Sequence, residues 1–421
     1  MRFVGCSFER ISVISTKDLE GLIRVPDELN HLSDDQLILE CKFQEGKIIH
    51  KGKKSAKEMK IALVSNFKQA CGISTYAEAL WQRIIPLVGD VRLFVEENDN
   101  PTSDILSLEN LKFDKDQVLP CWKRGQSLSK LSKAIQEYQP DIVWIQHEFG
   151  LWSHAGHWLS FLTQISNFRT IVTMHSVFHH QDKTVLEAAM PEIVVHLEGA
   201  RQVLLNEKGI SRKISLIPHG CNPPSTAGKL WNIYRTDKTI VQFGFLFKYK
   251  GWETSLRAVA LLKKQFPDVF FTGLCSESQF GKAEHQLYYD RLLELIRELG
   301  IEENVALVRG FQSDQVLDSY LRTNQIALLP YVSAPGHEVF GASGAARMSM
   351  EKQIPVVSSS IPHFSDLPTI KADSDEEIAA RVSELFLDWK TRRKQIDLQN
   401  KYLLEFSWEK IAERYVELFE L

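Results

Sequence analysis

The stretch IALVSNFKQACGISTYAEAL, residues 61–80, decides the fold. It starts with a short apolar run of strand length, passes through a turn of small residues at 70–72, and continues into an amphipathic run that predicts a helix from Ile73 to Ile85. A buried strand followed by a turn and a helix is the repeating unit of a parallel α/β sheet. The turn carries no GxGxxG pattern, so the dinucleotide-binding fingerprint is absent.

The same alternation continues through the first half of the chain. Further strand-like runs lie at 91–95, 141–146, 170–174, 202–205 and 214–217, and helical stretches lie at 127–138 and 184–199. Because the strand-like runs are apolar throughout rather than alternating, they predict a parallel sheet with helices on both faces.

A connector from Asn222 to Lys238, which contains paired prolines, serine, threonine and glycine, precedes a second alternation. Strands are predicted at 239–245, 269–274, 304–308, 326–330 and 354–359, and helices at 252–265, 284–299, 314–322, 342–352, 375–389 and 407–420. Two doubly wound domains are therefore expected, facing a central cleft, with ligands at the carboxyl ends of the strands. We assign residues 1–57 to an N-terminal appendage, 58–225 to the first domain and 236–404 to the second.

Composition narrows the function classes. A formal net charge of −4 predicts no attraction of the whole molecule to nucleic acid or anionic lipid. The lysine-rich run from Lys47 to Lys60 is either a solvated connector or a contact surface for an anionic acceptor. The six cysteines form no CxxC pair, which argues against a disulfide framework or a structural zinc site. The N-terminus lacks a signal-peptide core, and no apolar run reaches the ~18 residues of a membrane span. We therefore expect a cytoplasmic enzyme with no transmembrane segment, and peripheral membrane contact stays open.

Polar residues follow several predicted strands of the first domain. Gly72 lies beside a predicted helix N-terminus, where free amides and the helix dipole favour an anion, although a plain connecting turn has the same pattern. His147 and Glu148 follow one strand directly and can contact a ligand or bond within their own loop. His175 follows the next strand, where a neutral imidazole can bond a sugar hydroxyl or a phosphate oxygen, or have a structural role.

The candidates of the second domain begin with two lysines. The stretch GFLFKYKGW, from Gly244 to Trp252, links a predicted strand to a helix and contains Lys248 and Lys250. A lysine beside glycine at a helix entrance suits a diphosphate, because it adds charge where backbone amides already point. The alternative is a pair of surface lysines.

The stretch HEVFGASGAAR, residues 337–347, combines several useful features. Glu338 lies in a loop after a strand, where its carboxylate can accept hydrogen bonds from vicinal sugar hydroxyls. Small residues at 341–346 let a ligand approach the backbone, Ser343 can cap the next helix, and Arg347 can reach a phosphate. Tight packing of a small-residue helix is the alternative.

These pieces in this order resemble the retaining glycosyltransferases of family 4, which have the GT-B fold. The resemblance rests on TMHS (173–176), ISLIPHG (214–220), GFLFKYKG (244–251), GFQSDQVLDSYLRTNQIALLPY (310–331), and HEVFG (337–341) with IPVVSS (354–359). It runs from residue 59 to the end, and it implies that residues 405–421 form a helix that crosses back to the first domain.

The resemblance also implies roles for single residues. His175 would lie near the donor sugar and the reaction centre, Lys250 would bind the diphosphate, and Glu338 would be the first acidic residue of the E-x7-E motif that holds the transferred sugar. His147 and Glu148 would fall on the acceptor side. The donor-binding set comprises Gly72, Gly244, Lys248, Phe340, Gly341, Ala342, Ser343, Gly344 and Arg347.

Two positions depart from the family pattern. Phe245 replaces the usual arginine at the strand end, and the second motif glutamate, which grips the ribose, falls on Ala346, or on Met348 with a different gap. Arg347 or Lys248 can replace the lost charge, as a hypothesis. The nucleotide is therefore open, with a UDP- or GDP-sugar favoured as donor.

The expected function is transfer of a sugar from a nucleoside-diphosphate donor to an acceptor hydroxyl, with retention implied by the resemblance. No DxD-type pair lies in a strand-end loop, and His179 and His180 lack a carboxylate at matching spacing, so we expect no metal and no cofactor. A glycan, a lipid-linked sugar, a protein side chain, a small molecule and a modified nucleic-acid base are all open as the acceptor. The alternatives are a catalytically silent sugar-nucleotide-binding protein of the same fold, a nucleotide-sugar epimerase, and a phosphorylase.

Overall fold

The computed structural model describes residues 2–7, 10–14, 54–69, 71–97, 117–152, 154–179, 192–207, 209–210, 213–225, 237–277, 282–333 and 338–421. The chain divides into two units, Met1–Ser55 and Ala56–Leu421. In the first unit, β1 (Arg2–Ser7) pairs antiparallel with β2 (Arg10–Ile14). Residues 15–53, which include most of the predicted appendage and part of the lysine-rich run, lie outside the described residues.

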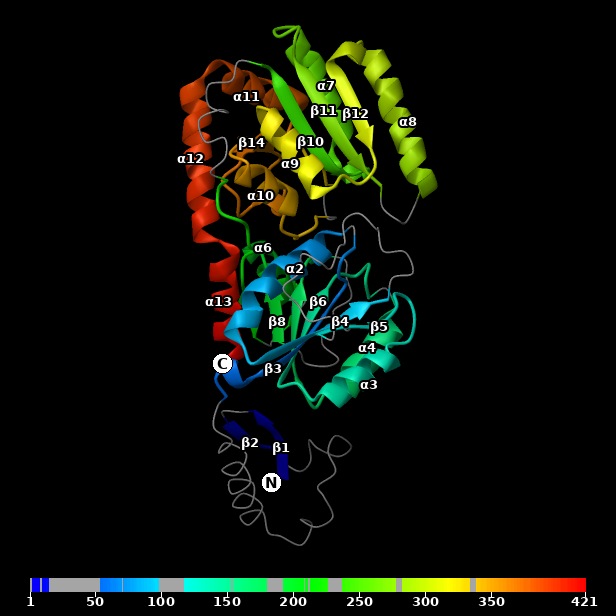
Figure 1. The fold of residues 1–421 in the computed structure, drawn as a ribbon, viewed down its shortest axis with the longest axis vertical. Helices are drawn as coiled ribbons and strands as arrows, with labels where there is room; N and C mark the ends of the chain where they lie inside the picture. The colour runs from blue at the N-terminus through cyan, green and yellow to red at the C-terminus, as the bar shows by residue number, and fades with distance from the viewer. Residues whose placement is uncertain are drawn as a thin grey trace. The chain divides into compact units, whose positions relative to one another are not determined.

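In the described part of the second unit, the first sheet has seven parallel strands in the order β5-β4-β3-β6-β7-β8-β9 (Figure 1). The strands are β3 (Lys60–Ser65), β4 (Asp90–Glu96), β5 (Val118–Trp122), β6 (Ile142–His147), β7 (Arg169–Met174), β8 (Glu192–Val195) and β9 (Ile214–Leu216). Because β3 has β4 on one side and β6 on the other, the strand order reverses there, and such a switch point is where open α/β sheets bind ligands.

Helices cover both faces of the first sheet. They are α2 (Gly72–Ile84), α3 (Ser129–Tyr138), α4 (Ala155–Gln164) and α6 (Glu198–Gln202), which continues as a π-helix (Val203–Glu207), with short 3₁₀ turns at Ala56–Glu58 and Ile85–Leu87. Leu131 of α3 and Trp158 of α4 are buried in one core with Ile145. Tyr76 of α2 is buried in the other core with Trp144. Successive residues along a strand therefore point to opposite faces of the sheet and pack against different helices.

The second sheet has six parallel strands in the described residues, in the order β12-β11-β10-β13-β14-β15. The strands are β10 (Thr239–Phe245), β11 (Phe270–Ser276), β12 (Val305–Arg309), β13 (Ile326–Leu329), β14 (Val356–Ser358) and β15 (Ile370–Lys371). The helices are α7 (Trp252–Lys263), α8 (Lys282–Leu299), α9 (Asp314–Thr323), α10 (Gly344–Glu351), α11 (Asp375–Leu387) and α12 (Trp389–Glu405), with 3₁₀ turns at Lys248–Lys250, Glu302–Asn304 and Pro362–Phe364.

The last helix, α13 (Trp408–Phe419), packs on the first sheet, beside α2 (Figure 1). The hydroxyl of Tyr415 lies 3.1 Å from that of Tyr76 and 3.1 Å from that of Thr173. The predicted GT-B fold class, with two Rossmann-like parallel sheets and a C-terminal helix that returns to the first, is confirmed.

Some of the predicted elements were wrong. Residues 202–205, predicted as a strand, are helical, and β8 lies inside the predicted helix 184–199. Val203 and Leu204 are buried in the core under β8 as part of a helix, and a short apolar run does not distinguish the two states. Helices α4 and α12 and the edge strands β5 and β15 were not predicted.

Among the described residues, every helix is too short or too polar to cross a bilayer.

Candidate functional site

His175 lies at the carboxyl edge of the first sheet, directly after β7. Its Nε2 is 2.9 Å from Oε1 of Gln146 in the neighbouring strand β6. The ring of Tyr76 packs edge-on against it, at 4.7 Å between ring centroids. Burial, and then the nearby His196 and His147, hold the pKa of His175 well below its ordinary value, so the imidazole is neutral at physiological pH.

His147 points to the opposite face of β6 from Gln146, because successive strand residues alternate. It is 1% exposed and lies against the rings of Phe149 and Trp158. Neither ring nitrogen has a hydrogen-bond partner among the described residues, and burial lowers the pKa of His147 to about 3. The structure places His147 as a neutral core histidine, and its contact with an acceptor stays a prediction.

Glu148 lies in the loop that follows β6. Its Oε2 accepts a hydrogen bond of 2.6 Å from the Ser176 hydroxyl, and its Oε1 accepts one of 3.1 Å from the Phe149 amide. Burial raises the pKa of Glu148. The pKa of Tyr249, which is raised mainly by burial, is also raised by the charge of Glu148, so this carboxylate lies near a residue that follows the second sheet's first strand.

The loop before α10 pairs with the segment after β7. The Phe340 amide donates to the Val177 carbonyl at 2.9 Å, and the Val177 amide donates to the Phe340 carbonyl at 3.2 Å. A side chain at Gly341 would lie 2.8 Å from the His175 carbonyl oxygen, so only glycine fits without displacement. Glu338 of the same loop lies 3.6 Å from Nε2 of His179. The structure therefore brings the Glu338 loop and the His175 segment into direct contact.

Ser343 caps α10 by accepting a hydrogen bond from the Ala346 amide at 3.3 Å, as the sequence predicts. Gly344 opens the helix, and a side chain there would lie 4.0 Å from Nε2 of His219. Ala342 packs against the core of the first sheet. At the start of α2, a side chain at Gly72 would meet no described atom within 4 Å, so this helix N-terminus borders open space.

Lys250 lies in the turn after β10, among aromatic rings. Its Nζ is 3.9 Å from the ring centroid of Tyr331 and 4.9 Å from that of Tyr249. Burial lowers the pKa of Lys250, and Tyr249 partly offsets this effect. A side chain at Gly244, whose φ is +144°, would lie 3.8 Å from Cε of Lys250. By contrast, Lys248 is exposed.

Gly251, next to Lys250, is needed for two reasons. Its φ is +70°, and an added Cβ would overlap the carbonyl oxygen of Pro330. The backbone of the lysine turn therefore packs directly on the end of β13, and this contact fixes the position of Lys250.

Arg347 is buried, with 1% exposure, and its donors are used inside the protein. It donates to the carbonyl oxygens of His219 at 3.2 Å and Ser343 at 3.0 Å, to the Tyr402 hydroxyl at 2.8 Å, and to Asp366. Burial is the largest single influence and disfavours the charge, but the attractions of Asp366, Tyr402 and Cys221 together outweigh it and raise the pKa of Arg347. The phosphate contact proposed for Arg347 stays a prediction. In the structure its guanidinium donates to protein atoms.

The residues at the two positions that depart from the family pattern also have apolar surroundings in the structure. Ala346 is fully buried, and Met348 packs on the same core. Phe245 lies 5.8 Å from Phe247 between ring centroids. The sequence analysis assigned no role to Gln146, which ends a predicted strand, or to His219, which lies within the ISLIPHG motif.

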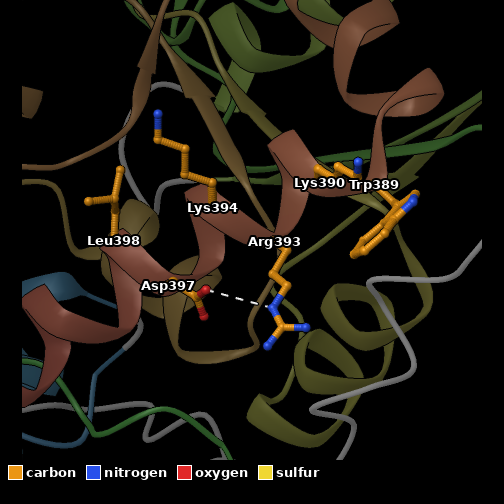
Figure 2. Close-up of a pocket in the computed structure, with 6 residues that line it drawn as sticks. All are labelled: Trp389, Lys390, Arg393, Lys394, Asp397 and Leu398. Atoms are coloured by element: carbon orange, nitrogen blue, oxygen red, sulfur yellow. Dashed lines mark ion pairs between the residues drawn. The ribbon is translucent and has the colours of Figure 1, made fainter.

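Among the described residues, no group of three or more His, Cys, Asp or Glu side chains is arranged to hold a metal ion. A surface pocket lies on α12, where Arg393 and Asp397 form an ion pair of 3.9 Å (Figure 2). It is lined by Trp389, Lys390, Arg393, Lys394, Asp397 and Leu398. None of these is a candidate site residue, so we assign this pocket no part in the candidate site.

Residues 229–401 match the model of a family described as glycosyl transferases group 1. The matched range contains the second sheet, the lysine turn and the loop before α10. No curated protein sequence matches the chain.

Many solved structures share the fold, and three represent them. A glycosyltransferase from Rickettsia africae is 14% identical with a TM-score of 0.65, and the alignment covers 86% of this chain and 98% of that one. The sucrose-phosphate synthase of Thermosynechococcus elongatus is 16% identical with a TM-score of 0.66, over 86% and 98%. Anabaena Alr3699/HepE, solved with UDP and glucose, is 14% identical with a TM-score of 0.65, over 86% and 99%. At these identities the likeness shows the fold.

Proposed function

We propose that the chain is a glycosyltransferase that moves a sugar from a nucleoside-diphosphate donor to an acceptor hydroxyl. The observation that carries this proposal is the pairing of the loop that bears Glu338, inside the range matching the glycosyltransferase family, with the segment that follows His175. This pairing brings a carboxylate loop from one sheet and a neutral histidine from the other to one place, as transfer between two bound substrates requires.

The proposed donor site lies at the N-terminus of α10. As the bond to the sugar breaks, negative charge develops on the leaving diphosphate, and prearranged donors stabilise it. Lys250 supplies a cation, and the amides near Gly341 to Gly344 together with the helix dipole supply partial positive charge. Glu338 would accept hydrogen bonds from the sugar, and His175 would contact the sugar beside the reacting carbon.

UDP is the nucleotide that we propose first. The Anabaena structure was solved with UDP and glucose, and an Escherichia coli structure of the same fold was solved with UDP-2-fluoro glucose. Retention of configuration follows from the resemblance to family 4, and metal independence follows from the missing DxD-type pair. Both are parts of the proposal.

The first domain, 58–225 with 405–421, is the proposed acceptor side, and 236–404 is the proposed donor side. A cytoplasmic location is also proposed. The acceptor stays open among a glycan, a lipid-linked sugar, a protein side chain, a small molecule and a modified nucleic-acid base.

A thermal-shift screen with UDP-, GDP-, ADP- and TDP-sugars tests the proposal. A donor at about 100 times its Kd stabilises the folded chain by about 2.7 kcal/mol, so one nucleotide class should raise the Tm clearly. Product analysis with the binding donor then looks for sugar release or transfer. Binding without turnover would favour a catalytically silent protein, the alternative that the two departures from the family pattern, Phe245 and Ala346 or Met348, leave open. No shift with any donor would contradict the proposal.

A further inference from the structure

The chain crosses between the two sheets twice, and the crossings lie side by side. The first follows β9, and the second lies between α12 and α13. The Cys221 amide donates to the Phe406 carbonyl at 3.1 Å, and the Trp408 amide donates to the Cys221 carbonyl at 3.0 Å. The Trp408 ring lies so close to Gly220 that a side chain there would overlap it. The two crossings therefore form one packed connection.

Arg347 attaches this connection to the first turn of α10. Its Nε donates to the His219 carbonyl in the first crossing, and its Nη2 donates to the Tyr402 hydroxyl of α12, just before the second. Its Nη1 donates to the carbonyl of Ser343, the cap of α10. One buried guanidinium thus joins the first crossing and the last turn of α12 to Ser343, the residue that caps α10.

Glu351 attaches the first crossing again, one turn later on the same face of α10. Its side chain is 7% exposed and accepts hydrogen bonds from the amide of Asn222 at 2.7 Å and from its Nδ2 at 3.1 Å. The Glu351 carbonyl accepts a third from the Ser225 amide at 2.8 Å. Separating the crossing from α10 would leave the buried Glu351 carboxylate without these partners, and a buried charge without partners is strongly destabilising.

The proposed donor site lies at the N-terminus of this same helix. We propose that Arg347 and Glu351 are positioning residues that couple nucleotide binding at α10 to the connection between the sheets. The inference rests on the proposed function, because it needs a nucleotide at the start of α10. It also gives Arg347 a role without contact to phosphate.

Hydrogen exchange of the full chain, with and without saturating UDP, tests this coupling. In the wild type, UDP should slow exchange at 217–222 and 406–409 by about fivefold or more, the lower end of measured site-to-site coupling. Arg347→Lys keeps the positive charge but removes the planar guanidinium with its fixed set of donors. Glu351→Gln keeps the size of the side chain but leaves one acceptor oxygen in place of two. Both should lose most of this protection. For Glu351→Gln, calorimetry should find the Kd for UDP within about threefold of the wild type, well below the tenfold that 1.4 kcal/mol would give.

Arg392→Lys is the matched control, because Arg392 is a second buried arginine, on α12, with 4% exposure. It should keep the UDP-dependent protection. If Arg347→Lys or Glu351→Gln fails to fold, Asn222→Ala removes one partner of Glu351 and leaves both charges in place, and it should weaken the protection.

Three results would overturn the proposal. One is a UDP Kd raised tenfold or more by Arg347→Lys with the protection of the crossings retained, since that would show direct contact with the nucleotide. Another is unchanged protection in both variants. The third is wild-type binding of UDP without any response at the crossings. If the wild type binds none of UDP, GDP, ADP and TDP, the proposed function itself fails, and calorimetry alone distinguishes that case.

Discussion

Gln146 and His175 share a hydrogen bond across the carboxyl edge of the first sheet, with Oε1 of Gln146 2.9 Å from Nε2 of His175. An amide oxygen can only accept, so in this arrangement the imidazole carries its proton on Nε2 and offers Nδ1 as an acceptor. Burial holds the pKa of His175 well below its ordinary value. His175 therefore acts as a neutral hydrogen-bonding group.

Gln146→Glu places a carboxylate beside this imidazole. The new charge favours the imidazolium, so the pKa of His175 should rise, and sugar turnover should fall by about tenfold as the acceptor nitrogen becomes protonated. ¹⁵N NMR of the histidine side chains measures the titration directly. Gln146→Met, which adds no charge, is the control, and an equal titration of His175 in both variants would contradict this assignment.

Gly341→Ala tests the contact between the two loops. The added methyl would lie 2.8 Å from the His175 carbonyl, so the loop must move away from the first sheet. We expect a loss of stability of about 1–3 kcal/mol, typical of overpacking, together with a loss of turnover. Gly150→Ala is the matched control, because a side chain there meets no described atom within 4 Å. Equal effects of the two substitutions on turnover would argue against a functional loop contact.

Lys250→Met separates function from stability. Burial disfavours the lysine charge, as its lowered pKa shows, and methionine fills similar space among Tyr249 and Tyr331 without that cost. The Tm of the ligand-free chain should therefore stay equal or rise, as at many functional sites that trade stability for activity. A clear fall in Tm by calorimetry would assign Lys250 a structural role instead.

His147 predicts a pH dependence of folding. Its folded pKa of about 3 is below the unfolded value, so the unfolded chain binds an extra proton as the pH falls below about 6.5. Stability is then lost on acidification, by roughly 2 kcal/mol at pH 5 for this one group. Urea unfolding at pH 7 and pH 5 should show a smaller difference for His147→Phe than for the wild type. An unchanged difference would mean that the ring is protonated or hydrated in the folded state.

Much of the fold could be predicted because buried parallel strands are mostly apolar on both faces, as TIVTM and TIVQFGF are. The prediction failed at residues 202–205 and 192–195, where a short apolar run fits a helix as well as a strand. Tertiary packing decides whether such a segment is a helix or a strand, and the local sequence does not contain that information.

The site could be predicted only where a residue's place in the chain fixes its place in the fold. His175 follows a strand, and strand ends meet at one edge of the sheet, so its position could be inferred. The surroundings of Arg347 could not, because its partners His219 and Tyr402 lie 128 and 55 residues away. The core position of His147 depends on the alternation of β6, which a strand-end rule ignores.

Calorimetric titration with UDP and with a UDP-sugar is the most direct test of the central claim, that Lys250 and Glu338 hold one sugar diphosphate. Lys250→Met should weaken both ligands by about tenfold or more, since a charge-assisted contact to the diphosphate contributes about 1.5–3 kcal/mol. Glu338→Gln should weaken the UDP-sugar and leave UDP unchanged, because the role proposed for Glu338 is to bind the sugar and not the nucleotide. Wild-type affinities for both ligands in both variants would contradict the account.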